Sequence, residues 1–502
     1  MKKGFTLIEL LAVILILGII ALIAIPTVNN ILKEARRGAF NSTLTNLEKV
    51  IEEKCTTEQI KNIEITTEYS IINGVIFPNI DIKGDLPDGE IEVNTNCDIS
   101  FTLSNNNFTG TKDFDNEIVV NDGAIKKYKE TLLNGADPVL KRNLIPVIIE
   151  NDGTVKKANI EEKWYSYEEK WWANAVILTD TGKVEDDGTI LENSIESYFV
   201  WIPRYKYKLF NVDEMSEVNG PPESSKAQDI EISFENKTTP LSVGDEVGEY
   251  YSHPAFEAFK ANGFWVGKFE LTGTETNPTI KPNETIIVSK HPQTFYNLGY
   301  NYKRDSDSHM IKNTEWGAVV YLSLSKYGIK KEVNVNNHEE YKTGYSATAG
   351  ADQTIYPGVY GSTADVTQPY NTEVGYKAST TGNISGVYDM SGGSNEFVAG
   401  YLAYTPEFTV NNNSYGDRYG DKYEFNFPFF GDAMREIGPI HRIDSMPYTS
   451  WYDDYAYDLD IHYTWYSRGG DFADGSHAGP LCFYSYRAEE RSNVGTRLVV
   501  MK

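Results

Sequence analysis

The amino-acid sequence predicts an α+β chain with a long N-terminal helix, a small β-containing head and a large C-terminal domain. Three observations lead to this prediction. Apolar residues recur at helical spacing from Phe5 to about Cys55, short β-like runs separated by turn residues follow over 56–125, and Trp and Tyr become frequent from about residue 130. A chain of 502 residues is also long enough for roughly two to four compact units.

The charge of the chain limits the partners that it can bind. The formal net charge is −26 and the pI is near 4.7, so acidic residues dominate. Affinity for nucleic acid comes mainly from Lys and Arg side chains that displace counterions from the phosphates. We therefore expect no nucleic-acid partner.

Residues 5–25 form an apolar stretch that follows two lysines. As a helix of about 20 residues it is long enough to cross a bilayer, with its cationic end in the cytoplasm. A cleaved secretory signal is the alternative, but no small-x-small cleavage site follows, and a helical pattern continues past Pro26. We expect residues 5–25 to span the membrane as the first part of a helix over 5–55.

The stretch Gly4-Phe5-Thr6-Leu7-Ile8-Glu9, with the apolar run and proline that follow it, resembles the class III signal of type IV pilins and pseudopilins. The resemblance implies that a prepilin peptidase removes residues 1–4 as a leader by cutting after Gly4. It also implies methylation of the new amine of Phe5. Other pilin subunits, the peptidase and the membrane are then the expected partners of the N-terminal helix.

Glu9 is an acid at the head of the apolar stretch. An unpaired carboxylate in hydrocarbon costs several kcal/mol unless it is protonated, reaches the interface or meets a cation. In pilins the amine freed on one subunit is thought to neutralise this carboxylate on a neighbour, so the resemblance implies that Glu9 directs assembly. The alternative is a side chain that only snorkels to the membrane surface.

Cys55 and Cys97 lie at the entrance of the small head, residues 56–125, and within it. Because everything after the membrane span is expected to be exported, these cysteines can form a disulfide that stabilises a small core. Two separate thiols are the alternative, since the sequence does not show the distance between the two Cα atoms. Cys482 is left without a partner.

Six segments of residues 130–502 occur in the order found in formylglycine-generating enzymes, and they resemble that family's type of C-type-lectin-like fold. The resemblance implies a compact α+β domain with much irregular chain and few long strands. The segments are YFVWIPRYKY (198–207), GFWVGKFELT (263–272), NTEWGAVVYLSLSKYG (313–328), SGVYDMSGGSNEFVAG (385–400), SRGGDF (467–472) and NVGTRLVV (493–500).

The chemistry of these enzymes is not expected to accompany the fold. The family holds copper with two cysteines after Arg-Gly-Gly, whereas only Cys482 follows that sequence here, and the seven His residues show no metal-ligand spacing. In the family, the segment around Glu396 helps to bind a structural calcium. Gly393 replaces an Asn of that segment, so calcium at Glu396 is a weaker alternative to no cofactor.

Aromatic and acidic side chains interleave over residues 450–492. Rigid rings give contact area at a low entropic cost, and this composition is typical of recognition surfaces. The alternative is that many of these rings are core and that the acids form a solvated face. The residues predicted to bind a ligand are Trp451, Tyr452, Asp453, Asp454, Trp465, Phe472, Asp474, His477, Tyr484 and Tyr486.

The tail from residue 467 onward resembles the variable segment of ligand-binding proteins that retroelements diversify. Its fixed frame corresponds to Gly475-Ser476, Ala478-Gly479, Phe483, Ser492 and Gly495-Thr496-Arg497, and Thr496 departs from the frame by replacing an aromatic residue. Arg497 itself is expected to be a buried, paired charge. The resemblance implies an exposed recognition patch between these landmarks, formed by Ala473, Asp474, His477, Pro480, Cys482, Tyr484 and Tyr486.

These features predict a minor or tip subunit of a type IV pilin-like filament that displays a domain for binding an extracellular protein or glycan. Before assembly the subunit is expected to be a single-pass protein of the cytoplasmic membrane, and afterwards to lie in a pilus at the cell surface. The alternatives are a pseudopilin of a secretion or DNA-uptake system and an anchored binding module that never polymerises. An enzyme of the formylglycine-generating fold is less favoured.

Overall fold

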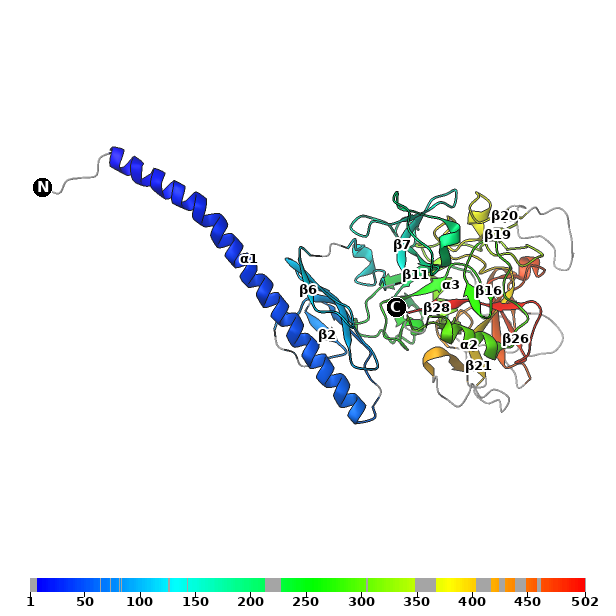
Figure 1. Cartoon of the computed structure of the whole chain (residues 1–502). Helices are drawn as coiled ribbons and strands as arrows, with labels where there is room; N and C mark the ends of the chain where they lie inside the picture. The colour runs from blue at the N-terminus through cyan, green and yellow to red at the C-terminus, as the bar shows by residue number, and fades with distance from the viewer. Residues whose placement is uncertain are drawn as a thin grey trace. The chain divides into compact units, whose positions relative to one another are not determined.

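The computed structural model divides into two compact units, residues 1–127 (unit 1) and residues 128–502 (unit 2) (Figure 1). Gly4 and Phe5 lie outside the described residues, and the side chains of residues 7–27, including that of Glu9, are not described. The described residues are 7–63, 65–72, 74–80, 82, 84–124, 127–141, 143–212, 227–303, 306–347, 367–402, 417–423, 429–437, 448–457 and 462–501.

Among the helices of the described part, none is both long and apolar enough to cross a membrane.

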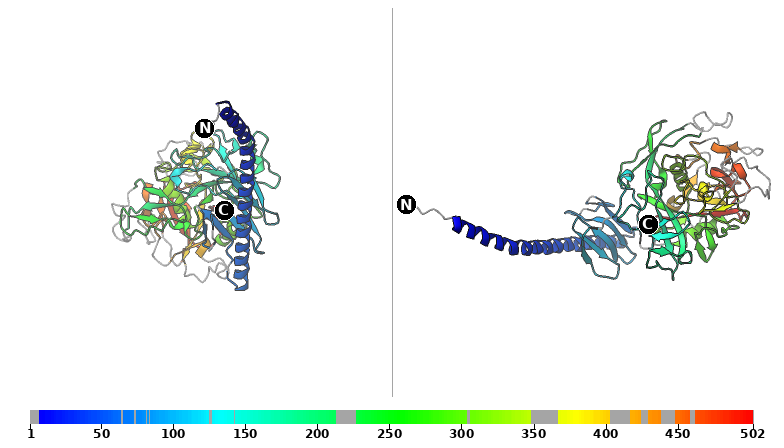
Figure 2. Two further views of the ribbon diagram at one scale, coloured as in Figure 1. Left: turned by 90° about the vertical axis from the view of Figure 1, so that its left-hand side faces the viewer. Right: turned by 90° about the horizontal axis from the view of Figure 1, so that it is seen from above.

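Unit 1 packs the C-terminal half of a long helix, α1 (Leu7–Ile60), against one antiparallel sheet (Figure 2). The strand order in this sheet is β2-β1-β3-β4-β5-β6, so all neighbours except β1 and β3 are consecutive in the chain. The strands are β1 (Glu68–Ile72), β2 (Val75–Phe77), β3 (Asp88–Val93), β4 (Ile99–Ser104), β5 (Phe108–Lys112) and β6 (Val119–Asp122).

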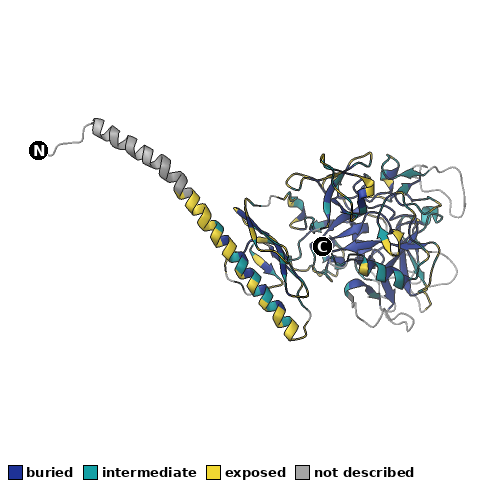
Figure 3. Ribbon diagram, in the orientation of Figure 1, coloured by how far each residue is buried: buried dark blue, intermediate teal, exposed yellow. Residues whose placement is uncertain are grey.

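Buried residues on α1 recur every three or four positions, at Phe40, Leu44, Leu47 and Ile51, whereas the positions between them are more exposed (Figure 3). This spacing places the four side chains on one face of the helix. Strand β5 approaches that face closely. A Cβ atom on Gly110 would lie 2.2 Å from Cδ1 of Leu44, so the strand has a glycine where it crosses the helix.

The helix continues to Ile60, beyond the boundary predicted at Cys55. No helix-breaking residue follows Cys55 until Asn62, which adopts a left-handed conformation with φ of 52° and ends the helix in a common way. A disulfide joins Cys55 to Cys97, with 5.7 Å between the two Cα atoms, and so ties the end of α1 to the turn before β4. Cys482, in contrast, is a free, buried thiol.

Unit 2 combines two large sheets with short helices, which confirms the expected α+β class. The first sheet is antiparallel with order β10-β8-β7-β9-β11-β15-β28-β18, so the C-terminal strand lies inside it. Its strands are β7 (Ile145–Ile149), β8 (Val155–Lys157), β9 (Asn174–Leu178), β10 (Thr189–Ile190), β11 (Ile195–Pro203), β15 (Gly263–Gly267), β18 (His309–Met310) and β28 (Leu498–Val500).

The second sheet is mixed, with order β22-β21-β25-β26-β24-β23 and with β27 beside β21. Its strands are β21 (Asn395–Leu402), β22 (Asp421–Tyr423), β23 (Tyr448–Thr449), β24 (Tyr455–Ala456), β25 (Trp465–Gly469), β26 (Gly479–Tyr486) and β27 (Val494–Thr496). A smaller three-stranded sheet is formed by β12 (Tyr205–Lys208), β13 (Ile232–Phe234) and β14 (Tyr250–Ser252). Two strand pairs are β16 (Thr272–Thr274) with β17 (Asn277–Thr279) and β19 (Tyr345–Ser346) with β20 (Gln368–Pro369). The α-helices are α2 (Pro292–Tyr302) and α3 (Asn313–Ser323).

Arg497 links the two large sheets of unit 2. Its guanidinium donates to both carboxylate oxygens of Glu396 on β21, at 2.6 and 3.0 Å, and to the carbonyl of Gly267 on β15 at 2.8 Å. Both side chains of the ion pair are completely buried. Arg497 is therefore the buried, paired charge that its place in the sequence predicts.

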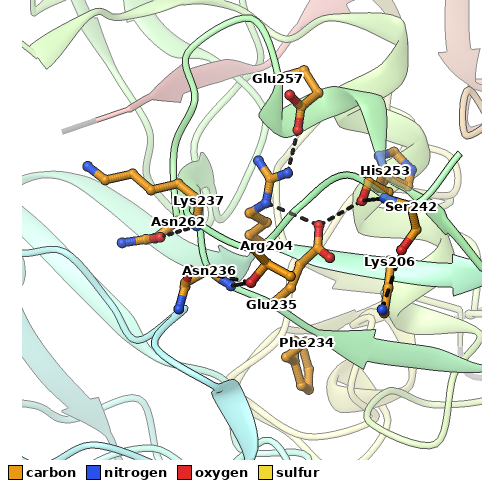
Figure 4. A network of polar contacts seen from close by, with 12 residues as sticks. Arg204, Lys206, Phe234, Glu235, Asn236, Lys237, Ser242, His253, Glu257 and Asn262 are labelled. Carbon is orange, nitrogen blue, oxygen red and sulfur yellow. Dashed lines mark hydrogen bonds and ion pairs between the residues drawn. The ribbon is translucent and has the colours of Figure 1, made fainter. Parts of the chain in front are cut away.

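A second buried network holds the three-stranded sheet together (Figure 4). Nε of Arg204 donates to Oε1 of Glu235 at 3.2 Å, and the same guanidinium also donates to Glu257. The hydroxyl of Ser252 donates to the same Glu235 oxygen at 2.9 Å. Because Arg204 and Glu235 are both buried, each needs the other as a counter-charge, and we assign the network a structural role.

Candidate ligand-binding site

Three of the residues predicted to bind a ligand are in the core, and the prediction is wrong for them. Trp465, Trp451 and Asp454 are 0%, 4% and 0% exposed. Trp465 lies on β25, a strand with neighbours on both sides, and its ring stacks on Tyr401 with 5.1 Å between centroids. Trp451 packs on Phe210. Their side chains face neighbouring core residues and not a surface.

Four other predicted residues lie at or near a row of stacked rings. We call Tyr455, Tyr457, His477, Tyr484 and Tyr486 the aromatic ladder, and each of these five side chains is partly exposed. His477 stacks on Tyr455 at 4.2 Å between centroids, Tyr457 on Tyr484 at 5.1 Å, and Tyr484 on Tyr486 at 5.8 Å. The planes in these pairs lie within 18 to 21° of each other. They form two stacks that meet at Tyr455, whose ring lies 5.6 Å from that of Tyr484 and is tilted by 59°.

The ladder follows from strand geometry. Successive side chains of a strand point to opposite faces, so Tyr484 and Tyr486 on β26 share a face, and Phe483, which precedes them, points into the core. Strand β24 pairs with β26 through Ala456 and Phe483, which places Tyr455 and Tyr457 beside the β26 tyrosines. The buried side chains of the two strands, Ala456 and Phe483, thus hold the ladder strands against the core.

His477 reaches the ladder from a short 3₁₀ helix, Gly475–His477. Its Nδ1 lies 2.9 Å from the carbonyl of Asp453, a contact that fixes the imidazole ring. Tyr452 and Asp453 both adopt left-handed conformations, with φ of 63° and 69°. Such conformations are strained for residues with a Cβ atom and occur often at functional sites.

Asp474 lies next to the ladder and carries a perturbed carboxyl group. The hydroxyl of Tyr484 lies 3.4 Å from Oδ1 of Asp474, and the amide of Asp471 donates to Oδ2 at 2.8 Å. Burial, assisted by the neighbouring Asp471 charge, raises the pKa of Asp474 to about 7. Asn493 and the amide of Ala473 donate to Asp471. Asp471 and Asp474 therefore form a hydrogen-bonded acidic pair beside the rings.

The remaining predicted residues are Phe472 and Tyr452, which are partly exposed, and Asp453, which is exposed. Phe472 makes an edge-to-face contact with Tyr341, at 5.0 Å between centroids. Tyr341, Tyr455 and Tyr457 were not among the predicted residues. The alternation Tyr455-Ala456-Tyr457 is a period-two signal that could have identified the latter two, whereas nothing near Tyr341 in the sequence connects it to this site.

The segment around Glu396, for which calcium was the weaker alternative, does not fit a calcium ion. Both carboxylate oxygens of Glu396 accept hydrogen bonds from Arg497, so the acid is already neutralised by a cation. Burial nevertheless raises the pKa of Glu396 to about 7 and that of the nearby Asp389 to about 6. Asp389 in turn accepts hydrogen bonds from Asn336 and from the amide of Gly344. The segment is an internal ion network.

The chemistry of Cys482 and of the buried histidines favours a structural role for each. Cys482 is fully buried, and burial together with Asp474 and Asp454 raises the pKa of its thiol, which disfavours a thiolate. Burial lowers the pKa of His253 to about 3, and His309 contacts both oxygens of Glu315. Across the described ranges, no group of three or more His, Cys, Asp and Glu side chains is arranged to hold a metal ion.

A family model for the prokaryotic N-terminal methylation motif matches residues 1–25. The match supports a type IV pilin-like precursor, which prepilin peptidase processes and which assembles with other pilins. Such a precursor is anchored in the membrane and then becomes part of an extracellular pilus. The match covers the N-terminal segment alone, so it concerns the helix and not unit 2.

No curated protein matches the chain. Among solved structures, the chain is similar to the M1, U1 and I1 variants of the Major Tropism Determinant, at 13%, 13% and 12% identity. The similarities cover 86%, 84% and 86% of this chain and 96% of each of the others, with TM-scores of 0.27, 0.29 and 0.27. TM-scores of this size do not establish a common fold, and we base no inference on them.

Proposed function

We propose that the chain is a minor or tip subunit of a type IV pilin-like filament and that unit 2 binds an extracellular protein or glycan. The N-terminal methylation motif supports the pilin-like part of this proposal. Unit 2 is several times larger than the pilin-like head, and such bulk is easier to place at a filament tip than along a closely packed shaft. In this proposal unit 2 retains the C-type-lectin-like form that its sequence segments resemble.

The aromatic ladder is the observation that carries the binding proposal. Stacked, partly exposed rings provide a broad apolar surface whose shape is already fixed before a partner arrives, so binding costs little side-chain entropy. The phenol and imidazole groups along the edge add hydrogen-bonding capacity. A surface of this kind suits either a glycan, whose ring faces stack on aromatic residues, or an apolar patch of a protein.

We further propose that unit 2 acts by binding and needs no cofactor. Its free thiol is buried with a raised pKa, and Glu396 is engaged by Arg497. Both features support the proposal. The chemistry of formylglycine-generating enzymes, which segments of unit 2 resemble, would require reactive cysteines, and a calcium ion would require a carboxylate that is not already paired.

The binding proposal can be tested with the full-length chain in detergent on an array of glycans and cell-surface proteins. Any partner found should lose about 30-fold in affinity with Tyr484→Ala, since truncating a central aromatic contact costs about 2 kcal/mol. Tyr484→Phe keeps the ring and should retain most of the affinity. Tyr250→Ala removes a partly exposed tyrosine outside the ladder and is the matched control.

Loss of binding with Tyr250→Ala, or full binding by Tyr484→Ala, would show that the ladder is not the contact surface. Assembly needs a separate test. Glu9→Ala should abolish the appearance of the subunit in sheared filaments, and normal incorporation would contradict an assembly role for this acid.

A further inference from the structure

A polar cavity of about 550 Å³ opens on unit 2, away from any residue of the aromatic ladder. Its size lies within the range of about 300–1,000 Å³ that is usual for small-molecule sites. One wall is a single face of α2, formed by Thr294, Asn297, Leu298 and Asn301, which follow the i, i+3, i+4, i+7 spacing of a helix. Residues of the turn between β16 and β17 and of the start of β17, Glu275–Pro278, also line it.

The charges that line the cavity are paired. Oε1 of Glu196 lies 2.8 Å from Nζ of Lys303 and accepts a hydrogen bond from the hydroxyl of Tyr302 at 2.9 Å. Glu275, at the rim, pairs with Lys290 at 2.5 Å. Because each carboxylate already has a cation, and the lining lysine already has a carboxylate, the cavity offers no unpaired charge to an ionic ligand.

The neutral side chains offer hydrogen bonds in complementary directions. Oδ1 of Asn297 accepts from Nε2 of Gln293 at 3.0 Å, and Nδ2 of Asn301 donates to the carbonyl of Asn297 at 2.8 Å. Within the described residues, this leaves Nδ2 of Asn297 as a donor and Oδ1 of Asn301 as an acceptor, one helical turn apart. Amide groups placed in this way suit ligands that both donate and accept, such as neighbouring hydroxyls.

The cavity also has a small apolar component. Leu298 on α2 and Pro278 on β17 line it, as does Tyr302, whose hydroxyl is hydrogen-bonded to Glu196 and to Ser197. Polar groups that fix orientation, combined with a few apolar surfaces, are the usual composition of a small-molecule site. The combination matches a ring that carries hydroxyl groups on its edge and C–H groups on its faces.

We infer that this cavity binds a neutral sugar ring, as a free hexopyranoside or as one unit of a glycan, without a metal ion. Hydroxyl groups of the sugar exchange hydrogen bonds with Asn297 and Asn301, and a C–H face packs on Leu298 and Pro278. This inference does not depend on the proposed function of the aromatic ladder, because no ladder residue lines the cavity.

The test uses the full-length chain with methyl glycosides of glucose, galactose, mannose and N-acetylglucosamine, and with glucuronate and glucosamine as charged comparators. Saturation-transfer NMR in the presence of EDTA should detect at least one neutral glycoside with a dissociation constant on the order of 1 mM, as expected for a ligand with few heavy atoms. Asn297→Leu and Asn301→Leu should each weaken it about tenfold, while leucine preserves the helix.

Asn193→Leu is the matched control, since Asn193 is an exposed asparagine of unit 2 outside the cavity. This variant and Tyr484→Ala should both bind the glycoside normally. The inference is overturned if no neutral glycoside binds saturably, if only a charged comparator binds, or if both α2 variants bind normally. Loss of glycoside binding with Tyr484→Ala would place the sugar on the ladder and would equally overturn a site in this cavity.

Discussion

Replacing Arg497 with methionine should destabilise unit 2 in a way that depends on pH. The substitution keeps most of the side-chain volume but removes the guanidinium that neutralises Glu396 and that also donates to the carbonyls of Gly267 and Tyr388. Glu396 is completely buried, with Asp389 as a second acid nearby. Removing one partner of such a pair leaves a buried charge without compensation, which costs about 3–5 kcal/mol.

The sign of the pH dependence follows from the acid that is left behind. Burial already raises the pKa of Glu396 to about 7 with Arg497 in place, and loss of the cation raises it further. An acid with a raised pKa in the folded state weakens that state as the pH rises above its unfolded value of about 4.5. Below about pH 7 Glu396 keeps its proton in both folded proteins, so the deficit of Arg497→Met relative to wild type should be smallest there and should grow as the pH rises above 7.

The assay can isolate unit 2, because all eight Trp residues of the chain lie in it. Denaturant titrations followed by Trp fluorescence, at about pH 5 and about pH 8, give the two free energies of unfolding that the prediction compares. Arg487→Met removes an exposed arginine and serves as the control. A deficit below about 1 kcal/mol at the higher pH, or one that grows toward acid pH, would refute the reasoning.

Three further predictions concern other parts of the chain. Cys97→Ser breaks the bridge to Cys55, which spans 42 residues, and should cost unit 1 about 4 kcal/mol; hydrogen exchange of the α1 amides should show the loss, with Trp fluorescence of unit 2 unchanged. Gly479→Ala should destabilise unit 2 by about 1–3 kcal/mol in the same fluorescence titration, because its Cβ atom would lie 2.1 Å from both carboxylate oxygens of Asp454. Asp474→Asn should gain stability relative to wild type as the pH rises from about 4 to about 7, because the pKa of Asp474 is raised from 3.8 to about 7; the gain is at most about 4 kcal/mol, and a difference that does not change with pH would contradict it.

Much of unit 1 could be predicted from the sequence because its signals are local. The apolar spacing of Phe40, Leu44, Leu47 and Ile51 is a property of one helix, and the structure buries these residues on one face. The end of the helix was less predictable. It depends on the left-handed conformation of Asn62, and no Gly or Pro near Cys55 marks the end in the sequence.

The ligand-binding surface was predicted only in part, because its members come from several strands. Tyr484 and Tyr486 could be found from the aromatic composition of their segment, but Trp465 lies in the same segment and is buried, with its ring stacked on Tyr401. Sequence alone does not show which side chains of a strand other parts of the fold cover. Tyr455 and Tyr457 join the ladder through the pairing of β24 with β26, a contact between distant parts of the segment.

The buried charges of unit 2 show a similar limit. Arg497 could be predicted to be paired from its place near the end of the chain, whereas for its partner Glu396 the sequence left calcium open as a weaker alternative to no cofactor. The two residues are 101 positions apart, so their pairing becomes visible only when β21 and β28 are in place. An acid that corresponds to a metal ligand in a related segment forms an ion pair instead when a guanidinium lies within hydrogen-bonding distance.

In the proposed function, a pilin-like helix carries unit 2 into a filament. The most direct test is to identify the N-terminal residue of the subunit recovered from sheared filaments. Mass spectrometry should find a chain that begins at an N-methylated Phe5 and still contains unit 2. A mature chain that begins after the apolar stretch would contradict this, as would filaments that lack the subunit although it is present in the membrane.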